Sequence, residues 1–230
     1  MNVQRISAIF EKDIKDFMKN MMLLTMPLIP VVLALIYDRM GTEEFPLTLL
    51  YLIVGVTFSA VTSSTMMTMM AEENEKKTLR GLILSPASFV DIIIGKSLVT
   101  GLITLVSLVV SLMILGIDPF LNTIPISGLI LQFLFFLFLG IGIGLFSKSI
   151  ASTSVYLMPV MFLFGFTPMV GQLGFSEDGI VMTIFDTFPV MQAIEAHENS
   201  SWAPIGIITL WVAAAALFMF ICFKRTVTDD

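Results

Sequence analysis

The sequence contains little charge and almost no cysteine or histidine, and these shortages exclude several classes of protein. Charged residues make up 13% of the 230 residues, with one cysteine and one histidine. Cys222 alone cannot form an intrachain disulfide or a cysteine metal site. Together with His197 it cannot supply a zinc shell. We therefore expect no metal site and no catalytic residue in this chain, and we expect His197 to lie exposed in an outer loop.

Long apolar runs are what the sequence has in abundance. Hydrophobic residues make up 57% of the chain, and the mean hydropathy is +0.96. Runs of about 18 or more apolar residues recur, and each is long enough to cross a bilayer as a helix. The sequence therefore predicts an all-α polytopic membrane protein. Six transmembrane helices are expected at residues 17–37, 47–70, 89–116, 125–146, 154–170 and 203–223.

Two further segments are apolar or amphipathic without being expected to span. Residues 1–16 place isoleucine and phenylalanine on one helical face and lysine and arginine on the other. This pattern predicts an interfacial amphipathic helix whose basic side chains reach toward the lipid phosphates. Residues 171–202 are too apolar for a solvated loop, and neither half is long enough to span. We expect them to form an extracellular, partly inserted segment that is broken at Pro189.

Residues 71–88, AEENEKKTLRGLILSPAS, form a polar loop between the second and third expected spans. Their charged and apolar residues alternate at helical spacing, which predicts a short amphipathic helix over residues 71–84, ended before Pro86. Acidic groups suit the start of a helix but gain nothing from anionic lipid headgroups. We therefore interpret this loop as a docking site for a soluble partner. A helix that only covers the membrane surface is the alternative.

The lysine and arginine residues are unevenly divided between alternate loops. With the N-terminus inside, every one of the 12 except Arg39 falls on the inner side. The positive-inside rule therefore predicts a multi-pass protein of the cell membrane with cytoplasmic N- and C-termini and a cytoplasmic 71–88 loop. The membrane core contains almost no ionisable group, which argues against an ion-coupled carrier. The energy source is expected to lie outside this chain.

Two short motifs resemble functional signatures, but each lacks residues that its signature requires. Residues 94–97, I-G-K-S, resemble the end of a phosphate-binding loop, yet Val90 stands where that loop needs a glycine. We expect Lys96 to snorkel to the membrane interface instead. Glu72-Glu73 is similar to the paired glutamates of CAAX-type intramembrane proteases, which need an arginine where Lys77 stands and further histidines. An intramembrane enzyme is therefore disfavoured.

The layout of nearly the whole chain resembles an ABC-2 type ABC transporter permease, the transmembrane subunit of an ABC exporter. The E-x-E-x-x-T-L-x-x-L-x-x-S-P pattern at residues 73–86 is similar to the signature of that family between spans two and three. The stretch FPVMQAIEA at residues 188–196 resembles its segment before the last span. The resemblance implies an ABC-2, type V exporter-like architecture, with a single transmembrane domain over residues 1–230 and residues 71–88 as a cytoplasmic coupling helix.

The resemblance also implies partners and a mechanism. It implies two copies of a cytosolic ABC ATPase that bind ATP and Mg, and a second permease chain in a homodimer or heterodimer. This chain would contact membrane lipid, bind no cofactor of its own and bind no nucleic acid. We expect it to move a hydrophobic or amphipathic substrate outward, such as a drug, an antimicrobial peptide or a lipid-like compound. The alternative is a membrane anchor or regulator that docks a cytosolic protein and transports nothing.

Two groups of residues are candidate sites. The residues expected to couple to the ATPase are Glu72, Glu73, Glu75, Thr78, Leu79 and Leu82. The residues expected to line a substrate path at the dimer interface are Pro27, Pro30, Ser59, Thr62 and Thr65. The serine and threonines lie at three-residue steps, a pattern that equally suits close packing between helices. Gly140 and Gly144, one helical turn apart, predict another packing contact.

Overall fold

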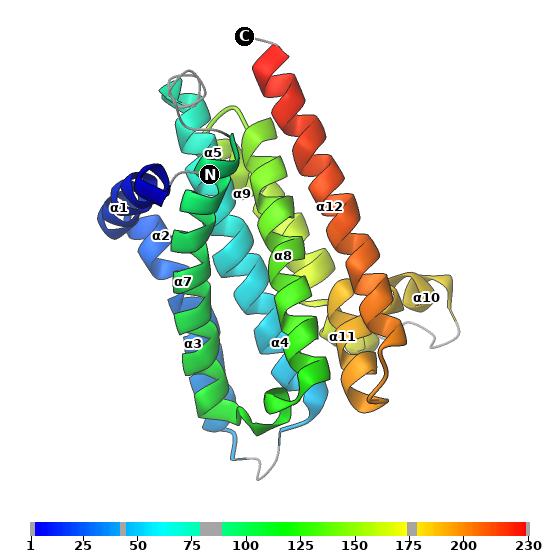
Figure 1. The fold of residues 1–230 in the computed structure, drawn as a ribbon. Coiled ribbons are helices and arrows are strands. Elements are labelled where there is room, and N and C mark those ends of the chain that lie inside the picture. The colour runs from blue at the N-terminus through cyan, green and yellow to red at the C-terminus, as the bar shows by residue number, and fades with distance from the viewer. Residues whose placement is uncertain (1–2, 42–44, 79–88, 174–178, 229–230) are drawn as a thin grey trace.

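The computed structural model describes residues 3–41, 45–78, 89–173 and 179–228, and within those ranges the chain is helical with no strand (Figure 1). The helices are α1 (Val3–Lys19), α2 (Met21–Thr25), α3 (Leu28–Asp38), α4 (Leu47–Val56), η1 (Thr57–Ser63, a π-helix), α5 (Ser64–Glu75), α7 (Phe89–Leu115), η2 (Asp118–Leu121), α8 (Thr123–Phe146), α9 (Ile150–Val160), η3 (Met161–Gly165, a π-helix), η4 (Thr167–Leu173), α10 (Ile180–Asp186), α11 (Pro189–Glu198) and α12 (Ala203–Thr228). Long helices lie side by side, and the N-terminal helix lies at the side of the bundle next to α2 and α7.

Within the described residues, 5 stretches are long and apolar enough to cross a membrane. They are Met21–Asp38, Leu47–Glu75, Val90–Leu115, Thr123–Phe146 and Ala203–Thr226. The region of the fifth expected span holds a shorter apolar helix, Ile150–Gly165. At about 1.5 Å per residue this helix is roughly 24 Å long, which is less than the ~30 Å core of a bilayer. The helical membrane architecture is as predicted, and the count of six spans stays a prediction.

A capping residue sets the start of the first span, and a proline sets the break within it. Helix α1 continues to Lys19, and the side chain of Asn20 then accepts hydrogen bonds from the backbone N–H groups of Met22 and Leu23. This cap starts a new helix, so the span begins at Met21 rather than at residue 17. The helix breaks before Pro27, whose ring cannot continue the hydrogen-bond ladder of α2.

The second span is a continuous helical rod made of α4, η1 and α5, and it lies at the centre of the bundle. We expected it to end at residue 70 and a separate helix to begin at residue 71. That expectation is wrong, because α5 continues to Glu75 and then turns at Lys77, which has a φ of 55°. Residues 71–75 are good helix formers with no glycine or proline to stop them. Residues 79–88 lie outside the described part of the chain.

Close packing against this rod depends on glycines of α8. A Cβ atom on Gly140 would lie 2.8 Å from the carbonyl oxygen of Ser63, and one on Gly144 would lie 2.7 Å from the Cβ of Met70. Real Cβ atoms do not approach so closely, so the two helices can pack at this distance only without side chains at these positions. The packing contact predicted for Gly140 and Gly144 is confirmed.

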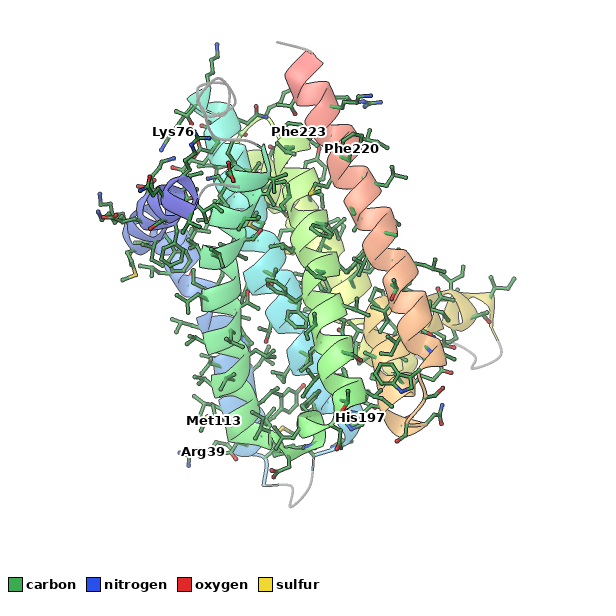
Figure 2. The ribbon with its side chains drawn as sticks, in the orientation of Figure 1. Arg39, Lys76, Met113, His197, Phe220 and Phe223 are labelled. Atoms are coloured by element: carbon green, nitrogen blue, oxygen red, sulfur yellow. The ribbon has the colours of Figure 1, made fainter. Side chains whose placement is uncertain are left out.

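The segment before the last span forms two short helices, α10 and α11, and Pro189 occupies the first turn of α11. His197 of α11 is half-buried rather than exposed as expected, and its Nδ1 lies 3.2 Å from the hydroxyl of Tyr51. Burial lowers the pKa of His197 below its usual value. In Figure 2 His197 lies with Arg39 and Met113 at the end of the bundle opposite Lys76 and Phe223.

Candidate functional site

The candidate site is a group of four charged side chains at the Lys76 end of the bundle, which we call the ion cluster: Lys12, Asp13, Glu73 and Lys96. The Nζ atom of Lys96 lies 3.2 and 3.1 Å from the two carboxylate oxygens of Asp13 and 3.2 Å from Oε1 of Glu73. Lys12 donates a 2.6 Å hydrogen bond to the same oxygen of Glu73 and lies 3.9 Å from Asp13. The cluster therefore joins α1, α5 and α7 and balances two positive against two negative charges.

Three members of the ion cluster are almost completely buried. Asp13, Glu73 and Lys96 are 3%, 4% and 1% exposed. Burial raises the pKa of Asp13 above its usual value, although the Lys96 ammonium opposes this shift. For Lys12, partial burial acts to lower the pKa, but the hydrogen bond to Glu73 and the negative charges of Glu73, Asp13 and Asp16 together outweigh it, and the pKa is raised. Because an unpaired charge at this depth is costly, removing one of the three buried members would leave the others without compensation.

The local sequence explains how α1 is held in this position. Its buried residues are Ile6, Ile9, Asp13 and Phe17, which follow one another at helical spacing along a single face. That face packs on α7 at Gly95, where a Cβ atom would lie only 2.7 Å from Cγ2 of Ile9. The glycine thus allows α1 to approach closely, and the approach brings Asp13 onto Lys96.

Two expectations about lysines are wrong. Lys96 does not snorkel to the interface, and Lys12 pairs with Glu73 instead of reaching toward lipid phosphates. Sequence reasoning missed the cluster because its members are far apart in the chain, with 83 positions between Asp13 and Lys96. One signal was present, namely the carboxylate of Asp13 in the middle of the apolar face of α1. A buried carboxylate on such a face requires a cationic partner on a neighbouring element.

The acidic residues expected to couple to a partner are bound within this chain. Glu73 belongs to the ion cluster and also accepts a hydrogen bond from the hydroxyl of Thr78. Glu72 forms an ion pair with Lys76, one helical turn further on. The carboxylate of Glu75 accepts a 2.8 Å hydrogen bond from the backbone N–H of Ile150, the first residue of α9.

The base of the 71–88 loop therefore has direct polar contacts with α1, α7 and α9. A cavity of about 110 Å³ lies beside the cluster, lined in part by Asp16, Glu72 and Lys76. The remaining two coupling candidates, Leu79 and Leu82, lie outside the described residues.

The hydroxyl residues expected along a substrate path lie inside the bundle of a single chain. Ser59, Thr62 and Thr65 are each 0% exposed. The hydroxyl of Thr62 lies 2.9 Å from that of Thr104 on α7, and the hydroxyl of Ser59 donates to the carbonyl of Gly55 at 2.7 Å. The structure thus shows these side chains in the packing arrangement that we considered as the alternative.

The two prolines lie near the kink of the first span. Pro30 is buried and Pro27 is half-buried, and the carbonyl oxygen of Pro27 accepts a 2.8 Å hydrogen bond from the hydroxyl of Ser107 on α7. Among the described residues the five path candidates therefore lie at two places, the prolines at the kink of the first span and the three hydroxyl residues inside the second. A path that they share requires a second chain or a change in helix packing.

Long apolar helices, an amphipathic helix beside them and charged residues that join α1, α5, α7 and α9 define a polytopic membrane protein. The chain belongs to the ABC-2 family, since a model described as "ABC-2 family transporter protein" matches residues 3–223. A comparison with curated proteins finds no match. The resemblance to an ABC-2 type permease is confirmed. Membership makes the chain a membrane component of an ABC transporter that is not itself catalytic, and implies association with an ABC ATPase.

Proposed function

We propose that this chain is the permease subunit of an ATP-driven exporter. It pairs with a second permease chain and with two cytosolic ABC ATPase subunits, which bind ATP and Mg. It moves a hydrophobic or amphipathic substrate outward; the choice of substrate is supported by the scarcity of charge in the described apolar spans, which suits no polar ion. The observation that supports this function best is the attachment of the loop base to α1, α7 and α9.

Through these attachments a displacement of the loop is transmitted to the helices within the membrane. The rod of α4, η1 and α5 is helical from Leu47 to Glu75, so movement of its end moves the whole rod. The ion cluster carries α1 and α7 along, and Glu75 carries the start of α9. A rigid-body motion of one half against the other is the usual way in which such a displacement opens a path.

The path itself is proposed where the second span meets the Ile150–Gly165 helix. Both elements are π-helical there, in η1 and η3, and π-helical turns are frequent at functional sites. A Cβ atom on Gly165 would overlap the hydroxyl oxygen of Ser59, so the two backbones nearly touch. Separation at this contact in a dimer would expose Ser59 to a substrate.

The proposed orientation places the N- and C-termini and the Lys76 end in the cytoplasm. Lys76 and Arg39 lie at opposite ends of the bundle (Figure 2), and Arg39 alone of the 12 basic residues was assigned outside. The test uses a Cys222→Ser background, which removes the single cysteine, with Lys76→Cys or Arg39→Cys added. A membrane-impermeant thiol reagent applied to whole cells should label the Arg39→Cys chain only. Labelling of the Lys76→Cys chain from outside would contradict the orientation.

The coupling proposal is tested by co-purification of the ATPase with the full chain. Leu79→Asp and Leu82→Asp should lower the amount of ATPase retained, because a charge is costly in an apolar protein groove. Met40→Asp is the matched control, since Met40 is exposed at the opposite end. Unchanged ATPase retention and ATP turnover in both loop variants would show that this loop is not the docking site. A chain that retains the ATPase but moves no substrate in vesicles would be the anchor or regulator instead.

A further inference from the structure

A second cavity at the Lys76 end lies between the α8–α9 corner and the last turns of α12. Its volume is about 290 Å³, and its lining includes Asn74, Phe146, Lys148, Cys222 and Arg225. It shares only the α5 helix with the ion cluster and is formed mainly by other elements. It is therefore a feature separate from the ion cluster.

The two cations of this cavity, Lys148 and Arg225, are arranged differently from those of the ion cluster. Lys12 and Lys96 are paired with carboxylates. Among the described residues, neither Lys148 nor Arg225 lies within ion-pair distance of a carboxylate. Both side chains are exposed and face one cavity. Two cations directed into the same cavity repel each other unless an anion lies between them.

The corner that carries Lys148 is fixed, and its other polar groups are already bound. The side-chain amide of Asn74 donates to the carbonyl oxygen of Ser147 at 2.8 Å. Ser149 caps α9 by accepting a hydrogen bond from the backbone N–H of Ser152, and Glu75 accepts one from that of Ile150. These bonds fix the backbone on both sides of Lys148, whose exposed side chain lines the cavity.

We propose that this cavity binds the phosphate headgroup of an anionic membrane lipid. The cavity lies at the ends of two candidate spans, Thr123–Phe146 and Ala203–Thr226, which is the depth at which headgroups lie. Basic pockets between transmembrane helices suit such headgroups. The ring of Phe146, which is 55% exposed, and the buried Cys222 provide an apolar wall beside the cations. A lipid, with a phosphate and an apolar remainder, matches this combination better than a free anion does.

The test measures lipid bound to the purified full chain in detergent by native mass spectrometry. Phosphatidylglycerol is compared with phosphatidylcholine, and with inorganic phosphate and glycerol 3-phosphate as soluble anions. The Lys148→Gln/Arg225→Gln variant should bind phosphatidylglycerol about 30-fold more weakly, which corresponds to about 1 kcal/mol for each cation. The control, Lys15→Gln/Lys19→Gln, removes two charges from α1 and should bind like the wild type. The swapped variant Lys148→Arg/Arg225→Lys keeps both charges and should retain binding.

Three results would overturn the proposal. The first is equal phosphatidylglycerol binding by the wild type and the Lys148→Gln/Arg225→Gln variant. The second is binding of inorganic phosphate or glycerol 3-phosphate as tight as that of the lipid, which would make a soluble anion the occupant. The third is unchanged lipid binding with loss of the co-purifying ATPase, which would assign the two cations to a protein partner. If the double variant does not fold, the single variants Lys148→Gln and Arg225→Gln should each lose about five-fold in affinity, and no loss in either would overturn the proposal equally.

Discussion

Replacing Lys96 with methionine removes the ammonium that joins α7 to α1 and α5 but keeps a long apolar side chain. Removing one partner of a buried ion pair costs about 3–5 kcal/mol, because the charge that is left has no compensation. The two remaining carboxylates are affected unequally. Glu73 keeps Lys12 at 2.6 Å and the hydroxyl of Thr78, whereas Asp13 keeps Lys12 at 3.9 Å. The uncompensated charge in Lys96→Met is therefore mainly that of Asp13.

This asymmetry makes the prediction specific. Asp13→Asn added to Lys96→Met should recover most of the lost stability, and Glu73→Gln should recover little. Thermal unfolding of the purified protein in detergent measures both, and the loss in Lys96→Met is expected to be on the order of 10 °C in Tm. Lys15→Met is the control, because its pair with Glu11 lies on the surface, and it should leave Tm unchanged. Equal recovery of Tm by Asp13→Asn and by Glu73→Gln, or a wild-type Tm for Lys96→Met, would refute the reasoning.

Three further predictions concern packing and pH. Gly144→Ala should destabilise the protein by about 1–3 kcal/mol in thermal unfolding, since its Cβ would lie 2.7 Å from a Cβ of α5; Gly206→Ala, with nothing within 4 Å, should not. Gly165→Ala should also lower Tm, and Ser59→Ala in the same chain should restore part of the loss, because the new Cβ meets the Ser59 hydroxyl; no restoration would disprove that contact. Burial lowers the pKa of His197, so the folded state favours its neutral form, and the stability that this gives is present above about pH 6.5 and lost as the pH falls through the lowered pKa. Tm measured from about pH 8 to about pH 5 should fall less in His197→Gln than in the wild type, and equal slopes would contradict this.

The membrane-embedded helices were predicted well because a bilayer leaves few alternatives. Backbone groups in lipid must bond within their own helix, so an apolar run of sufficient length is a helix. The third span was expected at residues 89–116 and is found at Phe89–Leu115, and the fourth was expected at residues 125–146 and is found at Thr123–Phe146. Outside the bilayer this constraint is absent. There the ends of helices are set by caps and by helix propensity. This is why α5 passes the expected end of its span and continues to Glu75.

The ion cluster could not be predicted from hydropathy, because its position depends on how α1 docks. A lysine near the end of a span has two outcomes, reaching the headgroups or meeting a carboxylate, and the sequence of α7 alone does not distinguish them. Gly95 determines which outcome Lys96 has, because it lets Ile9 of α1 approach α7 and so brings Asp13 next to Lys96. The hydroxyl residues of η1 are ambiguous in the same way, since one small-residue face serves either packing or a path.

The attachments of the second span also restrict where movement can occur. At the Lys76 end the ion cluster and Glu75 hold α1, α7 and the start of α9 to the rod. Near the middle of the rod, Gly55 and the hydroxyl of Ser59 lie in close approach to Gly165 of η3, and Met161 of η3 packs beside them against Leu52, Val56 and Ala60. We infer that a push on the loop base pivots the Ile150–Gly165 helix about the end held by Glu75, so that the displacement is largest toward this contact. A Gly165→Ala chain that folds and transports like the wild type would contradict this pivot, because close approach at that point would then be dispensable.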